Sequence, residues 1–220
     1  MRLRYRRALV AIALSFVCWS TIVLRNAGAQ ESTASKVEKS AAALVAEMRR
    51  SFTLNGKNVP PEIFRDFGDG DLADSGSIWV TVDVAAAIGS NLYFDPVTEY
   101  GKWKIQKKQR QPTDAPEETA YRFYGSTANG IIVVVASFNG GGSGTFHTLH
   151  FLDVAAGAGF DSDGKHYRRV NMTNIRSIVL GDRWDGDIKI SGNAVRVVTT
   201  RNGPADESAR PPFTLTAERP

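Results

Sequence analysis

The spacing of hydrophobic positions changes from helical to extended along the chain. Between residues 35 and 52, apolar side chains recur mostly three and four positions apart, which predicts one amphipathic helix. Ser35 followed by Glu38 gives this helix a capping-box start. From Ser77 onward apolar and polar residues alternate, and Gly, Asn and Asp separate the alternating runs. This second pattern is typical of antiparallel strands.

One run departs from the alternation and is apolar at every position. Residues 131–135 are isoleucine and valine throughout, so a strand here has two hydrophobic faces. We expect this strand at the centre of a sheet, with both of its faces covered. The Asn129-Gly130 pair directly before it predicts a tight hairpin turn from a strand at residues 121–126.

The strand-like runs define the expected fold class. About nine or ten short strands and one N-terminal helix predict a mainly β fold, either an antiparallel β-sandwich or a small soluble β-barrel. The tail at residues 202–220 contains four prolines, and only residues 213–215 suit a short strand there. We therefore expect one β-rich domain over residues 30–220.

The first 29 residues have the arrangement of an export signal. Four arginines within residues 2–7 precede an apolar run at residues 8–24, and Ala27-Gly28-Ala29 follows. This order predicts cleavage after Ala29 and a periplasmic or secreted protein with no membrane span. The alternative is that the apolar run stays uncleaved as a membrane anchor, because its length approaches that of a bilayer-spanning helix.

Removing this leader changes the charge and the cysteine content. The full chain has 27 Lys and Arg against 23 Asp and Glu, and five of the basic residues but none of the acidic ones lie in the leader. The remaining chain is close to neutral, so we expect no nucleic-acid partner, because such binding draws on a strong positive field. The only cysteine, Cys18, also lies in the leader, so the fold has to be stable without a disulfide.

An acidic segment at residues 66–76 raises the question of calcium. Closely spaced Asp oxygens on a Gly-containing loop suit this ion, and the candidate ligands are Asp69, Asp71 and Asp74. Counted from Asp69, however, Ala73 occupies the fifth position and Asp74 the sixth, where an EF-hand has a ligand and a glycine. We therefore predict a solvated loop and no metal or cofactor, with a nonstandard calcium loop as the alternative.

The histidines and serines do not form a recognisable catalytic motif. His147 and His150 lie three apart on a predicted strand and so face opposite ways, which predicts hydrogen-bonded, partly buried side chains rather than a metal pair. Ser143 follows Gly141 as in a hydrolase elbow, but Thr145 stands where the second glycine belongs. We predict no catalytic residue, and a protein that is not an enzyme is the favoured interpretation.

The segment at residues 181–187 is the candidate ligand site. Its aromatic ring, guanidinium and carboxylates can stack on a sugar or another ring and hydrogen-bond the edge of that ring. The candidate ligand-binding residues are Trp184, Asp182, Arg183, Asp185 and Asp187. The alternative is that Trp184 packs back onto the end of the sheet while the charged side chains stay solvated.

These features together predict a class of function. We expect an exported, non-enzymatic, β-rich binding or structural protein of a bacterial envelope, which contacts a ligand or an envelope component through loops at one end of its sheet. The alternative is a secreted hydrolase that acts on glycans, with a carboxylate pair drawn from the loops at residues 66–74 and 182–187. Opposed carboxyl oxygens about 5 to 10 Å apart across a cleft would favour the hydrolase.

Overall fold

The computed structural model describes residues 41–67, 80–89, 96–108, 115–199 and 212–219. The chain divides into two compact units, Met1–Ala42 and Ala43–Pro220, and almost all of the described residues belong to the second. The predicted leader at residues 1–29 lies outside the described residues, as do the calcium-loop candidates Asp69, Asp71 and Asp74. These interpretations stay predictions.

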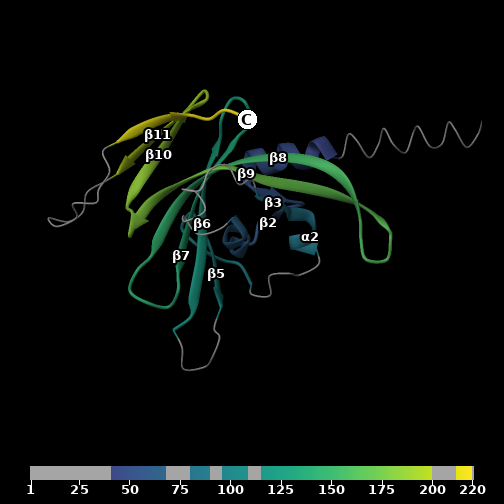
Figure 1. The fold of residues 1–220 in the computed structure, drawn as a ribbon, viewed down its shortest axis with the longest axis horizontal. Coiled ribbons are helices and arrows are strands. Elements are labelled where there is room, and N and C mark those ends of the chain that lie inside the picture. The colour runs from purple at the N-terminus through teal and green to yellow at the C-terminus, as the bar shows by residue number, and fades with distance from the viewer. Residues whose placement is uncertain (1–40, 68–79, 90–95, 109–114, 200–211, 220) are drawn as a thin grey trace, which may run out of the picture. The chain divides into compact units, whose positions relative to one another are not determined.

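A seven-stranded antiparallel sheet is the largest element of the second unit (Figure 1). Its strands lie in the spatial order β3 (Val80–Asp83), β9 (His166–Asp182), β8 (Phe146–Phe160), β7 (Ile132–Asn139), β6 (Glu117–Ser126), β5 (Trp103–Lys108) and β4 (Thr98–Tyr100). Over the described residues the sheet is open, because β3 and β4 form its two edges. The prediction of a mainly β, sandwich-like fold is confirmed, and the alternative of a small closed barrel is wrong.

Shorter elements lie against this sheet. One small antiparallel sheet consists of β10 (Gly186–Ser191), β11 (Ala194–Thr199) and β12 (Phe213–Thr216), and another of β1 (Thr53–Leu54) and β2 (Lys57–Asn58). β12 includes the short strand that the sequence predicts in the C-terminal tail. The helices within the described ranges are one at residues 41–51, the 3-10 helix η1 (Pro61–Phe67) and α2 (Val84–Gly89). None of them is long and apolar enough to cross a membrane.

β7 is the middle strand of the seven and is buried on both faces. Ile132 and Val134 belong to one hydrophobic cluster, whereas Val133 and Val135 belong to another on the opposite face. All four side chains are 0% exposed. Burial of one such side chain stabilises the folded state by about 1.5–3 kcal/mol. The prediction of a central strand that is covered on both faces is therefore confirmed.

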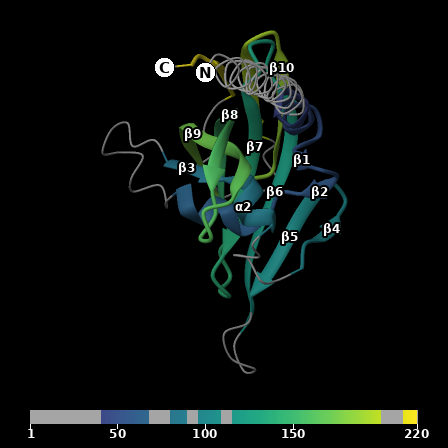
Figure 2. The same ribbon diagram turned by 90° about the vertical axis from the view of Figure 1, so that its right-hand side faces the viewer.

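Helices and the β1–β2 hairpin cover the first face (Figure 2). At the end of the helix at residues 41–51, Met48 and Phe52 insert between this helix and the sheet. The Phe52 ring lies 5.1 Å from Tyr121 at 84° and 5.7 Å from Phe123 in a stacked arrangement. Phe52 adopts a φ of 55°, which stops the helix one residue before the predicted end. The predicted start at Ser35 lies outside the described residues.

The small sheet of β10, β11 and β12 covers the second face (Figure 1). Ile188, Val195 and Val197 alternate with exposed or half-buried residues and pack against Val133 and Val135. Two segments that are far from β7 in the chain thus bury its two faces. The β10–β12 sheet has only three strands, so it covers only part of the larger sheet.

The two histidines of β8 face opposite sides of the sheet, as the alternation predicts. His147 lies on the side of β10–β12, and His150 packs against Phe64 and Phe67 at ring distances of 5.3 and 5.8 Å. His150 Nδ1 lies 3.0 Å from the hydroxyl oxygen of Ser177. Burial lowers the pKa of His150 to about 4, so this side chain is neutral at pH 7.

We predict that the folded protein loses stability as the pH falls from 6.5 to 4. In the unfolded chain His150 takes up a proton near its ordinary pKa of 6.5, whereas in the folded protein its pKa is about 4. Acid therefore favours the unfolded state, and this residue alone lowers the unfolding free energy by about 3 kcal/mol across that window. Burial also lowers the pKa of His147, which adds a contribution of the same sign.

Urea unfolding at a series of pH values measures this effect. The His150→Gln variant should lose most of the fall in unfolding free energy between pH 6.5 and pH 4. The control His166→Gln, which alters an exposed residue of β9, should keep this fall. An equal pH dependence of the unfolding free energy in wild type and His150→Gln would contradict the attribution of this effect to His150.

Candidate functional site

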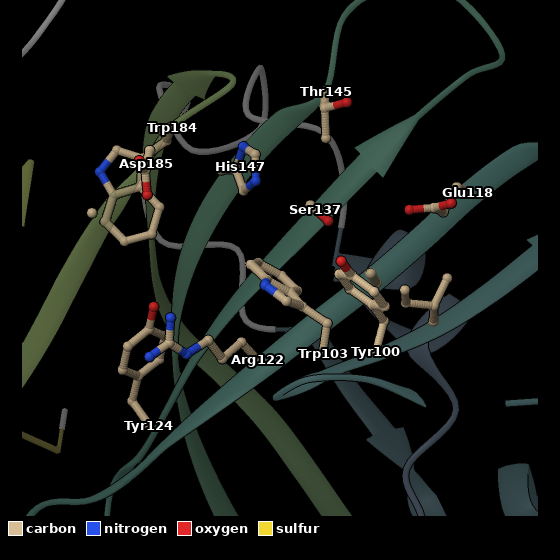
Figure 3. A pocket seen from close by; sticks show the side chains of 13 residues that line it. Tyr100, Trp103, Glu118, Arg122, Tyr124, Ser137, Thr145, His147, Trp184 and Asp185 are labelled. Atoms are coloured by element: carbon tan, nitrogen blue, oxygen red, sulfur yellow. The ribbon is translucent and has the colours of Figure 1, made fainter. Parts of the chain in front are cut away.

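A pocket of about 350 Å³ opens on the second face of the large sheet, beside the start of β10 (Figure 3). Its lining residues come from β4, β5, β6, β7 and β8, from the β7–β8 loop, and from the turn between β9 and β10 with the first residue of β10. This is the strip of the face that the small sheet leaves uncovered. In Figure 3, Trp184 and Asp185 lie on one side of the pocket, and Trp103 and Tyr100 lie on the other.

The floor of the pocket follows from the period of two in β6. Glu118, Arg122 and Tyr124 are separated by even numbers of residues and point to the pocket, whereas Tyr121 and Phe123 between them point to the opposite core. The neighbouring strands add side chains in register. Trp103 of β5 lies directly opposite Arg122, and Ser137 of β7 lies directly opposite His147 of β8.

The turn between β9 and β10 forms one wall and is fixed to the β7–β8 loop. The Thr145 N–H donates to Asp182 Oδ1 at 2.7 Å, and Arg183 Nη2 donates to the Ser143 carbonyl oxygen at 2.7 Å. Trp184 follows these residues directly. A side chain at Gly186 would collide with the Trp184 ring and with the Val198 carbonyl oxygen, so the glycine permits the tryptophan to approach the start of β10 closely. The turn thus sets the position of Trp184.

Aromatic rings flank a histidine in this pocket. The His147 ring lies 5.9 Å from Trp103 in an edge-on arrangement and 6.2 Å from Trp184 in a tilted one. Trp103 and Trp184 are both half-buried and pack against the second core with part of their surface. Each ring therefore has one side on the core and can offer the rest of its surface to a bound molecule.

Arg122 is the cation of the pocket. Its guanidinium lies over the Tyr124 ring at 4.4 Å from the ring centre, a cation–π distance. Its Nη2 lies 3.8 Å from Asp187 Oδ1, at the limit of an ion pair, and the Asp187 side chain is 52% exposed. Such a long, exposed pair contributes little.

Four buried polar atoms of the pocket have no hydrogen-bond partner among the described residues. They are Arg122 Nε, Tyr124 Oη, His147 Nδ1 and Trp184 Nε1. A buried polar atom without a partner costs about 1–3 kcal/mol, and most native proteins avoid this arrangement. Five others lie elsewhere in the described part of the fold, namely Arg49 Nε and, on β9, Arg168 Nε, Arg169 Nε, Asn171 Oδ1 and Asn174 Oδ1. The pocket is distinctive because the side chains that carry these four atoms all line one cavity.

Burial shifts the pKa of two of these groups further toward their uncharged forms. Desolvation raises the pKa of Tyr124 to about 12, with the Arg122 charge opposing the shift. Desolvation lowers the pKa of His147, and the backbone of Thr145 and the charge of Asp182 oppose this. At pH 7 the pocket therefore offers a neutral phenol and a neutral imidazole, each able to donate or accept a hydrogen bond.

The structure divides the sequence-predicted ligand residues into two groups. Trp184 and Asp185 line the pocket, whereas Asp182 and Arg183 hold the turn and Asp187 lies near Arg122 at 3.8 Å. The Trp184 ring packs against the second core cluster and also lines the pocket. Ligand binding by this residue stays a prediction.

Sequence analysis missed several residues of the site, namely Trp103, Arg122, Tyr124 and His147 as lining residues. A signal existed in the alternation of Glu118, Ala120, Arg122 and Tyr124, which marks a polar strip on one sheet face.

Neither metal ligands nor known relatives identify the site further. Within the described ranges, no three His, Cys, Asp or Glu side chains come together in a way that could hold a metal ion. No family model, curated protein or solved structure matches this chain. A fold by itself does not determine a function, so the function has to be argued from the pocket.

We predict opposite effects on stability from two isosteric substitutions in β6. Tyr124→Phe removes a buried hydroxyl that has no partner, so the unfolding free energy should stay unchanged or rise by about 1 kcal/mol. Tyr121→Phe removes a hydroxyl that bonds to the backbone of Val59, so the unfolding free energy should fall by about 1 kcal/mol. Chemical denaturation of both variants measures the difference. A clear loss of stability in Tyr124→Phe would show that this hydroxyl has a partner in the folded protein.

Proposed function

We propose that this protein is an exported, non-enzymatic binding protein that holds a small polar ligand with a ring face in the pocket of the large sheet. The observation that carries the proposal is a pocket lined by two tryptophans and by side chains that hold four buried polar atoms without a hydrogen-bond partner among the described residues. A ligand that hydrogen-bonds these atoms would remove the cost of their burial. Binding sites accept such a cost because it is recovered when the ligand binds.

The position of the site on a sheet supports binding. Strands hold side chains more rigidly than loops do, and a pre-organised site loses less entropy when it binds. Trp103, Arg122, Tyr124 and His147 all lie on strands. The turn that carries Trp184 is fixed by hydrogen bonds to the β7–β8 loop. The pocket volume of about 350 Å³ suits a small molecule rather than a polymer segment of many units.

A hydrolase is the second candidate, and one observation favours it. Two carboxylates, Glu118 and Asp185, line the same pocket, and glycan hydrolysis commonly uses such a pair. Glu118, however, forms an ion pair with Lys107 at 3.1 Å, which occupies one of its oxygens. The pair first expected from the sequence also needs the loop at residues 66–74, most of which lies outside the described residues.

Export is supported by the leader alone. Its arginines, apolar run and Ala27-Gly28-Ala29 end fit a signal that is removed after Ala29. Cell fractionation of the expressing host and N-terminal sequencing test this. We expect a product that begins at Gln30 outside the cytoplasm, in the periplasm or the medium. Recovery of the full-length chain from the cytoplasm would contradict export, and a full-length chain in the membrane would support the uncleaved anchor instead.

A ligand panel tests the binding function. The probes are ring compounds of several classes: neutral and acidic saccharides, free aromatic amino acids and nucleosides. The readout is the NMR signals of the tryptophan side-chain N–H groups, because Trp103 and Trp184 both line the pocket. We expect saturable shifts of both signals with at least one probe. Arg122→Gln should weaken that binding at least about tenfold, because it removes a charged hydrogen-bond donor.

The matched control is Arg176→Gln, which removes an exposed arginine of β9 that does not line the pocket. This control should bind with unchanged affinity. A panel without any saturable shift, or a probe that binds wild type and Arg122→Gln equally well, would contradict the proposal.

A further inference from the structure

One edge of β8 lies open where the β8–β9 hairpin extends past the rest of the large sheet (Figure 1). β7 pairs with β8 only from Phe146 to Leu152, whereas β9 pairs with it as far as Phe160. On the side away from β9, no described part of the chain forms a backbone hydrogen bond with residues 155–160. We call this stretch the open edge of β8.

Two contacts show which backbone groups of the open edge point outward. At the hairpin end, the Asp161 N–H donates to the Lys165 carbonyl oxygen, so Asp161 faces β9. At the other end, Arg49 Nη2 donates to the Val154 carbonyl oxygen at 3.2 Å, so this oxygen points away from β9. The pairing with β9 is regular between these two positions, and successive residues of an antiparallel strand face alternate neighbours. The N–H and C=O groups that point outward are those of Ala156, Ala158 and Phe160.

The open edge lacks the features that normally keep strand edges from pairing. Proteins block such edges with short length, charged side chains, proline or a bulge. The outer strands β3 and β4 have only four and three residues, and both contain an acidic residue. Residues 155–160 contain neither a charge nor a proline, and their pairing with β9 has no bulge. Residues 155–158 are exposed, and Phe160 is 64% exposed. A further strand can therefore pair with this edge.

A second copy of the same edge fits it in one register. Two antiparallel copies of β8 centred on Ala158 place each Ala158 opposite the other, and Ala156 opposite Phe160 of the second copy. All of the outward N–H and C=O groups of the open edge then lie in hydrogen-bonded pairs. The same alternation puts the Phe160 ring on the same face as the Ala156 methyl group opposite it, which leaves room for the ring.

The two ends of the open edge carry opposite charges. Beside its first residue, Asp153 lies 3.2 Å from Arg219 and 3.6 Å from Arg49, so this cluster has a net positive charge. The turn at the other end contains two aspartates and one lysine, at residues 161, 163 and 165, and has a net negative charge. Antiparallel pairing brings the acidic turn of each copy toward the arginine cluster of the other, twice by symmetry. The charges thus favour an antiparallel pair of identical edges.

We propose that two copies of this protein pair edge to edge through residues 155–160 of β8, so that their large sheets join into one continuous antiparallel sheet. The contact is isologous, because the same residues serve on both sides. The paired stretch is smaller than a standard interface, so the dimer is weak and forms as the concentration rises. None of these residues lines the pocket, so the pairing is independent of the proposed ligand.

Analytical ultracentrifugation of the protein purified from the expressing host tests the pairing. We expect a reversible monomer–dimer equilibrium between about 1 μM and about 1 mM. Ala158→Lys should weaken the dimer at least about tenfold, because two lysines would face each other at the symmetry axis. Ala158→Glu should weaken it for the same reason. An equimolar mixture of the two variants should restore the dimer, because lysine then faces glutamate.

Two controls separate loss of pairing from loss of folding. Lys189→Glu alters an exposed residue of β10 and should dimerise like wild type. Both Ala158 variants should keep a thermal unfolding midpoint close to that of wild type, because this residue is exposed and its N–H does not face β9. A monomer at every concentration, or a dimer that Ala158→Lys leaves intact, would overturn the proposal. A mixture of the two variants that stays monomeric would overturn the register centred on Ala158.

The charged ends predict an effect of salt on the dimer. Raising the salt concentration should weaken the wild-type dimer, and Asp163→Asn should reduce this dependence, because it removes a carboxylate from the acidic turn. A dissociation constant that does not change with salt would overturn the contribution of charge to the pairing.

Amide hydrogen exchange distinguishes strand pairing from other kinds of association. The amides of Ala156 and Phe160 should become protected as the concentration rises, whereas the amide of Gly157, which faces β9, should not change. Protection of Ala156 and Phe160 already in the dilute monomer would show that another segment of the same chain covers the edge, and would overturn pairing between copies. Association without this alternation of protected amides would overturn the edge-to-edge contact.

Discussion

The burial of both faces of β7 is the constraint on which the rest of the structure depends. Val133 and Val135 on one face and Ile132 and Val134 on the other are fully buried, and neither face could remain in water without a large loss of stability. Each face therefore has to be covered by another part of the chain. One covering segment precedes β7 in the sequence and the other follows it. The helical segments before residue 90 bury one face, and the strands after residue 185 bury the other. No disulfide within the chain assists them, because Cys18 is the only cysteine of the sequence.

The candidate site results from the small size of the β10–β12 sheet, which covers only part of the second face of the large sheet. The β10–β12 sheet is narrower than the face it covers, so the strip over β5 and β6 carries polar and aromatic side chains in place of a core. At this strip the fold departs from the rule that buried polar atoms are paired, since Arg122, Tyr124, His147 and Trp184 each keep one unpaired atom. Local exceptions of this kind are typical of functional sites.

The sequence predicted the elements of the fold better than it predicted their partners. The alternation after Ser77 was sufficient to predict a strand-rich fold, and the apolar run at residues 131–135 was sufficient to predict the central place of β7. Both predictions depend only on the local pattern of apolar and polar residues. The choice between a sandwich and a closed barrel depends on long-range pairing, which short alternating runs do not specify. The composition of the turn at residues 181–187 was sufficient to find Trp184 and Asp185. Arg122 and Tyr124 were missed because they alternate with the core residues Tyr121 and Phe123, and nothing local shows which strip of the face stays uncovered.

Native-state hydrogen exchange of the individual amides tests the central claim most directly. If both faces of β7 are covered, the amides of Val133, Val134 and Val135 exchange only through global unfolding, so their exchange free energy equals the unfolding free energy measured with denaturant. The amides of the short outer strand β12 should exchange at lower free energies, through local opening. Exchange of the β7 amides well below the global unfolding free energy, at values like those of β12, would contradict the account.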